Sequence, residues 1–351
     1  MRYFSLISFL LLPVLSGQEI TSPLANKWRD AGKTFTWKST FAENSGRNPE
    51  IFYACMGDEA KPAILMIHGW PTSSFDFHLL IAELQADYRI CTLDFPGYGL
   101  SAKPANGYRY GLRDDAVLAW YFVTEIVKLK EFALLSHDRG DSVALAFLEL
   151  YQAAANPPFR ITHQFLSNGN MYLPLANLSA FQQQVLAQGA NSPLFKSMNA
   201  KALATGMGLT TYTPPLGAAD PEVAALADMF AHDSGVEILP ATIQYLNERK
   251  AWEEEFLQAL AKSAVPATLI WGIHDLVSPV RVADHVWDVS LKSRKAAATY
   301  WLIPCGSHYL QHDQPGEIAK IVKLSLGKGA PAAPFNLSPT ACGAVLNAKQ
   351  P

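Results

Sequence analysis

The stretch FALLSHDRGD, residues 132–141, decides the fold. Its apolar run FALL is typical of a strand buried on both faces in a parallel sheet. The small residues Ser136 and Gly140 lie two positions before and two positions after Asp138, a spacing that allows a strand to turn sharply into a helix. The stretch therefore predicts a strand, a tight turn that presents Asp138 above the sheet, and a helix that continues to Tyr151.

The same alternation of strand and helix extends outward from this turn. From Lys61 onward, short apolar runs alternate with helical patterns, which predicts an α/β fold with parallel strands joined by right-handed crossovers. A helical pattern over 112–129 leads into the central strand. The expected strands are residues 63–67, 89–94, 132–135, 163–166, 267–271 and 298–303.

The alternation stops between Asn168 and about Ser263, where the pattern is one of helices and loops. This segment is an expected insertion. Asp220 followed by Pro221 predicts a helix start. A long helix is expected over 240–262, with Tyr245, Arg249 and Trp252 on a shared face, as in a core helix or the inner face of a lid.

The composition excludes several classes of protein. The 351 residues include 28 Lys and Arg against 31 Asp and Glu, and 49% are hydrophobic. Nucleic-acid binders carry a clustered basic surplus, and disordered chains are much less apolar. We therefore expect a globular protein that binds no nucleic acid.

The two ends of the chain have their own patterns. Residues 1–17 combine Arg2, an apolar run and small residues, the layout of a secretory signal peptide. No later apolar run is long enough for a stable membrane span. The chain is therefore expected to be secreted or periplasmic. Residues 327–351 form an expected tail rich in Gly, Pro and Ala.

Export permits disulfide bonds between the four cysteines, Cys55, Cys91, Cys305 and Cys342. Three pairings are open. The pairing of Cys305 with Cys342 is favoured because it would hold the tail against the body of the protein. The alternative of four buried thiols stays open.

The side chain at the predicted turn is a candidate nucleophile. Asp138 would lie at a helix N-terminus, whose dipole is expected to lower the carboxyl pKa and keep the group ionised. An ionised carboxylate can attack an electrophilic carbon. A rival register, residues 140–144, would make Ser142 the nucleophile of an esterase, but this serine falls a full turn inside the helix.

A general base is expected near the end of the last strand. His308 follows that strand in a Gly-Ser loop, although His312 is close enough in sequence to be confused with it. Asp275 ends the preceding strand and could accept a hydrogen bond from the imidazole. The backbone N–H groups of Trp70, in the HGWP turn, and Arg139 could face the same oxygen and form an oxyanion hole.

These motifs together resemble the α/β-hydrolase superfamily. The resemblance covers most of residues 50–325 and rests on HGWPTSS from His68, LDFPGYGLSAKP from Leu93, SHDRGD from Ser136, WGIHD from Trp271 and GSHYLQHDQP from Gly306. It is nearest to the aspartate-nucleophile branch of epoxide hydrolases and haloalkane dehalogenases. SHDRGD, LSNGN and QYLNERKAW are similar to the mesoderm-specific transcript proteins.

This resemblance implies an architecture. An eight-stranded, mostly parallel sheet would carry a helical cap inserted after the sixth strand. The hydrolase core would comprise residues 18–169 and 264–326, and the cap residues 170–263.

The resemblance also implies a reaction. Asp138 would form an ester with an apolar substrate, and His308 with Asp275 would activate water to cleave it. An epoxide needs an acid for its opening oxygen. Tyr245 is the nearest match, with Tyr172 and Tyr212 as second candidates. No metal and no cofactor are expected. The most favoured activity is therefore that of an epoxide hydrolase.

Alternatives follow from departures from the family pattern. Dehalogenases usually place tryptophan after the nucleophile, where this chain has Arg139, and some place asparagine where it has Trp70. An arginine after the nucleophile resembles fluoroacetate dehalogenases, which carry a second arginine at the position of Ser142. A haloalkane or haloacid dehalogenase, a serine esterase and a non-catalytic member of the fold are the alternatives.

Overall fold

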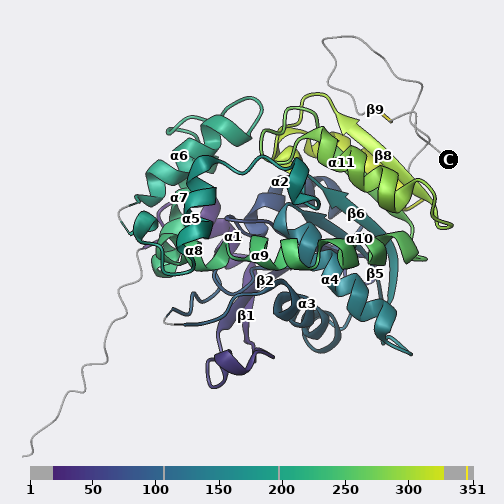
Figure 1. Ribbon diagram of the computed structural model, residues 1–351, viewed down its shortest axis with the longest axis horizontal. Helices are drawn as coiled ribbons and strands as arrows, with labels where there is room; N and C mark the ends of the chain where they lie inside the picture. The colour runs from purple at the N-terminus through teal and green to yellow at the C-terminus, as the bar shows by residue number, and fades with distance from the viewer. Residues whose placement is uncertain (1–18, 106, 197, 328–344, 347–351) are drawn as a thin grey trace, which may run out of the picture.

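The computed structural model describes residues 19–105, 107–196, 198–327 and 345–346, and Figure 1 shows their arrangement. The predicted signal peptide, residues 1–17, lies outside this part of the chain. So do Cys342, the favoured partner of Cys305, and most of the predicted tail.

A single sheet forms the centre of the molecule. Its order is β1-β2-β4-β3-β5-β6-β7-β8-β9 within the described ranges. The strands from β4 through β8 pair in parallel, whereas the β1–β2, β2–β4 and β8–β9 pairs are antiparallel. The strand bounds are β1 Gly32–Thr36, β2 Glu50–Met56, β3 Ala63–Ile67, β4 Arg89–Leu93, β5 Glu131–His137, β6 Arg160–Ser167, β7 Ala267–Gly272, β8 Ala298–Ile303 and β9 Val345–Leu346.

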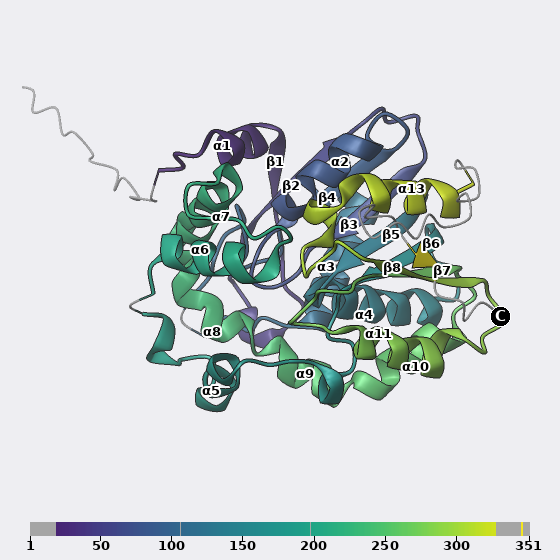
Figure 2. The same cartoon turned by 90° about the horizontal axis from the view of Figure 1, so that it is seen from above.

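Helices cover both faces of the sheet, as Figure 2 shows. One face carries α2 and α13, which pack on each other, and the opposite face carries α3, α4, α10 and α11. Because both faces are covered, most residues of the parallel strands are buried. The bounds are α1 Pro23–Asp30, α2 His78–Leu84, α3 Leu112–Tyr121, α4 Arg139–Ala153, α10 Glu253–Lys262, α11 Val280–Val286, α12 Leu310–Asp313 and α13 Pro315–Ser325.

A group of helices lies between β6 and β7 in sequence; in Figure 1, α5 to α8 lie at the left and α9 nearer the middle. It contains α5 Ala180–Gln188, α6 Ala200–Thr211, α7 Pro221–Ala231, α8 Leu239–Thr242 and α9 Tyr245–Ala251. Asp220 caps α7 and Pro221 begins it, as predicted. The predicted fold class, a mostly parallel sheet with a helical cap after the sixth strand, is confirmed.

One predicted helix is broken. The expected continuous helix over 240–262 is instead α8, α9 and α10, and Trp252, with φ −118° and ψ 15°, separates the last two. Periodicity alone missed the break because the apolar spacing continues through it. On either side of the break, α9 contacts α3 and α10 packs on α4.

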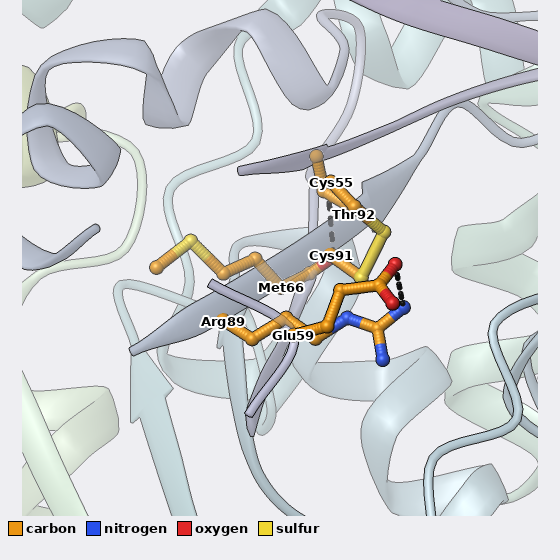
Figure 3. The surroundings of a disulfide bond; sticks show 6 residues. All are labelled: Cys55, Glu59, Met66, Arg89, Cys91 and Thr92. Atoms are coloured by element: carbon orange, nitrogen blue, oxygen red, sulfur yellow. Dashed lines mark hydrogen bonds and ion pairs between the residues drawn. A yellow bond between two sulfur atoms is a disulfide. The ribbon is translucent and has the colours of Figure 1, made fainter. Parts of the chain in front are cut away.

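A disulfide joins the neighbouring strands β2 and β4. The alternative prediction of four buried thiols is therefore wrong. Cys55 on β2 faces Cys91 on β4 directly in the antiparallel register, with a Cα–Cα distance of 4.2 Å. Figure 3 shows the bond beside the Arg89–Glu59 ion pair, whose N–O distance is 3.4 Å. The sequence did not indicate this pairing because β2 lies before the strand alternation that was recognised.

Across the described ranges, every helix is too short or too polar to cross a bilayer.

Candidate active site

The turn at Asp138 has the backbone that the sequence predicts. Asp138 follows β5, precedes α4 and has φ 54° and ψ −121°. A positive φ is costly for a residue with a side chain, so the surrounding packing must hold it. Gly140 permits that packing because a Cβ there would overlap the backbone oxygen of Ile67 and lie 2.7 Å from the oxygen of His68. At Gly69, a Cβ would lie 2.6 Å from the Cβ of Asp138.

The Asp138 carboxylate uses its two oxygens differently. Oδ1 accepts a hydrogen bond from the Trp70 backbone N–H at 2.7 Å. Oδ2 lies 3.6 Å from Nε2 of His308. The carboxylate is therefore held through one oxygen, while the other faces the imidazole.

His308 lies between two carboxylates. Its Nδ1 is 2.9 Å from Oδ2 of Asp275, and its Nε2 faces Asp138. All three side chains are almost fully buried, with 3% exposure each. The structure thus brings together the three residues that the sequence singled out, from the loops after β5, β7 and β8.

The pKa values of this group are coupled. Burial alone would lower the pKa of His308, but the charges of Asp275, Asp138 and Asp76 raise it to about 9. Burial raises the pKa of Asp138, and His308 together with the Trp70 and Arg139 N–H groups limits that rise. The expectation that the helix N-terminus lowers the Asp138 pKa was wrong, because desolvation outweighs it.

Arg139 contributes a side chain as well as an amide. Its guanidinium is buried and forms an ion pair with Asp115 through Nη2. Nε and Nη1 have no hydrogen-bond partner among the described residues. Burial raises the pKa of Asp115 to about 7, although Arg139 opposes that rise.

Two tyrosine rings lie against this guanidinium. The Arg139 Cζ atom is 5.5 Å from the ring centroid of Tyr245 and 5.1 Å from that of Tyr98. Burial and the charge of Asp138 raise the pKa of Tyr245, and Arg139 lowers it. Both phenols therefore keep their protons at neutral pH.

Tyr98 was not recognised from the sequence. Its side chain is buried, and its hydroxyl interacts with the Thr242 side chain. The signal that could have found it is its place in FPGYG, directly after β4, because loops at the carboxyl ends of parallel strands form ligand sites.

The rings of the other two candidate tyrosines do not lie against the Arg139 guanidinium in the described part of the chain. Tyr212 stacks on Tyr309, the neighbour of His308, with ring centroids 4.8 Å apart. Tyr172 stacks on His285 at 3.7 Å and lines a depression of about 400 Å³ whose lining contains none of Asp138, Asp275 and His308. Its sequence position near the end of β6 gave no information on the direction in which the chain leaves the sheet.

The rival residues occupy structural positions. Ser142 is the fourth residue of α4 and is buried there. His312 lies 3.7 Å from Asp313 and contacts the ring of Tyr212 edge-on. In the part of the chain that is described, no group of three or more His, Cys, Asp or Glu side chains is arranged to hold a metal ion.

The sequence matches one family model, described as the alpha/beta hydrolase fold, over residues 62–315. The bovine mesoderm-specific transcript homolog protein is 30% identical over 268 residues, which cover 74% of this chain and 75% of that protein. Mouse epoxide hydrolase 4 is 29% identical over 92 residues, 26% of this chain and 25% of that protein.

Solved structures share the fold. A thermophilic esterase from Thermogutta terrifontis superimposes with a TM-score of 0.65 and 16% identity, covering 84% of this chain and 98% of the other. At this identity, the likeness extends to the fold alone.

Proposed function

Since the chain belongs to the α/β-hydrolase fold family and is a hydrolase, we propose that it is an epoxide hydrolase with Asp138 as the nucleophile. One observation carries the proposal. His308 lies between the Asp275 and Asp138 carboxylates, at 2.9 Å and 3.6 Å, and an amide N–H fixes the other oxygen of Asp138. This arrangement suits a carboxylate nucleophile and a separate general base for water.

In the first step, Oδ2 of Asp138 attacks an epoxide carbon. A carbon–oxygen ester bond forms, the ring carbon–oxygen bond breaks, and its electron pair remains on the ring oxygen. Tyr245 gives that oxygen a proton. Tyr98 is a second candidate donor, because its ring lies against the same guanidinium. The positive charge of Arg139 stabilises the resulting tyrosinate.

In the second step, water cleaves the ester. Ester formation removes the Asp138 charge, which lowers the His308 pKa from its resting value of about 9. His308 passes its proton to the tyrosinate and then accepts a proton from water. The hydroxide adds to the ester carbonyl, the Trp70 and Arg139 amides stabilise the oxyanion, and collapse releases the diol and the Asp138 carboxylate.

A trapping experiment tests this proposal. In His308→Gln, the ester should accumulate on the Asp138 peptide after incubation with styrene oxide, and diol turnover should fall by about 10²–10⁴-fold, as for loss of a general base. His312→Gln is the matched control, because that histidine lies outside the Asp138–His308–Asp275 group, and it should turn over normally. Mass spectrometry of the digested protein locates the adduct.

Two results would contradict the aspartate mechanism. One is undiminished turnover in Asp138→Ala. The other is an acyl or alkyl group on Ser142, which would favour a serine esterase.

A haloacid dehalogenase is the second candidate, and the free N–H groups of Arg139 favour it. Within the described ranges, Nε and Nη1 are buried without a hydrogen-bond partner, on the residue that follows the nucleophile, and a substrate carboxylate could accept from them. Halide release on 2-bromopropionate, without diol formation on epoxides, would support this candidate over the first.

A further inference from the structure

Asn168 occupies a special position directly after β6. It is fully buried and has φ 50°, in the left-handed region. Asparagine tolerates this region better than most residues with a side chain. The backbone here therefore favours Asn or Gly, and the choice between them depends on the side-chain amide.

The Asn168 amide joins two loops at the carboxyl edge of the sheet. Its Nδ2 donates to Oδ2 of Asp275 at 2.8 Å and to the Ser307 carbonyl at 2.9 Å, and its Oδ1 accepts from the Gly272 N–H at 3.0 Å. The orientation of the amide is fixed, because a backbone N–H can only donate and a carbonyl can only accept.

The residues beside Asn168 contact the nucleophile turn. The Ser167 carbonyl accepts from the Asp138 N–H at 3.0 Å, and the Ser167 N–H donates to Asp141 at 3.2 Å. At Gly169, a Cβ would lie 2.9 Å from the Asp138 carbonyl oxygen. Residues 167–169 thus contact the nucleophile turn on one side. On the other side, Asn168 contacts the loops that carry Asp275 and His308.

Asn168 shares an acceptor with the general base. Oδ1 of Asp275 accepts from the Val277 and Ser278 N–H groups at 2.7 and 2.9 Å. Oδ2 accepts from His308 at 2.9 Å and from Asn168 at 2.8 Å. A second donor on Oδ2 disperses its negative charge, so that oxygen attracts the imidazolium proton less strongly.

We propose that Asn168 is a positioning residue, which holds the Asp275 carboxylate against His308 and limits how strongly Asp275 favours the protonated imidazole. The side-chain hydrogen bonds of Asn168 go to Asp275, Ser307 and Gly272, and none goes to Asp138 or His308. The inference rests on the proposed function for its kinetic consequence, because a more basic His308 would be a poorer base for ester cleavage at neutral pH.

Other charged and titratable groups also face His308, and the Asn168 variants leave them in place. They are His137 at the end of β5, Asp138 in the turn that follows, Asp76 from the segment before α2, and Tyr309 from its own loop. Changes in the His308 titration among Asn168 variants therefore report on residue 168 and Asp275.

The first test is an NMR titration of His308 in the substrate-free protein. Asn168→Gly keeps the positive φ and removes the amide, and Asn168→Asp adds a carboxyl beside Asp275. The His308 titration midpoint should rise from wild type to Asn168→Gly and again to Asn168→Asp. Asn170→Ala, a buried asparagine two residues on, is the matched control and should titrate as wild type.

The second test separates the two chemical steps with styrene oxide. Ester hydrolysis at pH 7 should slow by about 10- to 100-fold in Asn168→Gly, the loss expected for a hydrogen bond to a charged group. Alkylation of Asp138 should stay within about threefold of wild type, because the nucleophile keeps its own contacts. Raising the pH should restore part of the hydrolysis rate.

Several outcomes would overturn the inference. An unchanged His308 midpoint in both variants would do so, as would equal slowing of both steps, which indicates a structural role only. If Asn168→Gly does not fold, the His308 titration midpoint in Asn168→Asp, whose side chain has nearly the same shape, decides whether the inference holds. The NMR titration needs no substrate, so its result stands even if Asp138 forms no adduct and the proposed function fails.

Discussion

Arg139 serves the site through its backbone and its side chain. Its N–H hydrogen-bonds the Asp138 carboxylate, and its buried guanidinium pairs with Asp115 between aromatic rings. A buried ion pair costs a large desolvation free energy, and removing one partner leaves an uncompensated charge. Asp115, the partner of Arg139, therefore contributes both to the stability of the protein and to the geometry of the site.

At pH 9, above the Asp115 pKa of about 7, Asp115→Asn should lower the free energy of unfolding by about 3–5 kcal/mol, because it leaves the Arg139 charge buried without its counter-ion. Urea denaturation followed by circular dichroism measures this loss. Glu131→Gln, which breaks the exposed Arg160–Glu131 pair at 2.6 Å, is the matched control and should cost less than about 1 kcal/mol. Equal losses in the two variants would contradict the assignment of the buried pair as a structural requirement.

At the scale of elements, the site depends on how closely α4 approaches β3. Gly140, in the first turn of α4, lies against the backbone oxygens of Ile67 and His68 at the end of β3. This close approach aligns the α4 N-terminus with the HGWP turn, so the Trp70 N–H reaches Asp138. A side chain at residue 140 would separate these two elements.

Gly140→Ala should lower the free energy of unfolding by about 1–3 kcal/mol, as overpacking does, and it should slow adduct formation on Asp138. Gly206→Ala is the control. Gly206 lies inside α6, and a Cβ there would meet nothing within 4 Å. That variant should gain about 0.5–1 kcal/mol, because alanine favours a helix interior. Thermal unfolding and intact-protein mass spectrometry measure the two effects, and a harmless Gly140→Ala would refute the packing argument.

The sequence was informative where one element carries its own pattern. The strands at 63–67 and 298–303 match β3 and β8 at both ends, and the turn at Asp138 follows from the small residues around it. Features that depend on contacts between distant segments were missed. β1 is a mostly exposed edge strand without an apolar pattern. The burial of Tyr98 and the position of Tyr172 away from Asp138, Asp275 and His308 depend on how the cap packs.

At the scale of the whole molecule, the disulfide bears on the predicted export. Cys55 and Cys91 are 36 residues apart and join β2 to β4, on the antiparallel side of the sheet. Such bonds persist in oxidising compartments and are rare in reducing ones. A stabilising disulfide at this position would agree with a secreted or periplasmic protein, which the apolar N-terminal segment predicts independently.

The double variant Cys55→Ala/Cys91→Ala should lose about 2–4 kcal/mol of unfolding free energy under oxidising conditions, because the bond restricts the unfolded chain. Urea denaturation of wild type and variant, each with and without thiol reductant, separates this effect from packing. In reductant both proteins lack the cross-link, so the difference should shrink to the smaller contribution of the two side chains. A difference that reductant does not change would mean that packing alone stabilises this pair of strands, and the disulfide would then give no support to export.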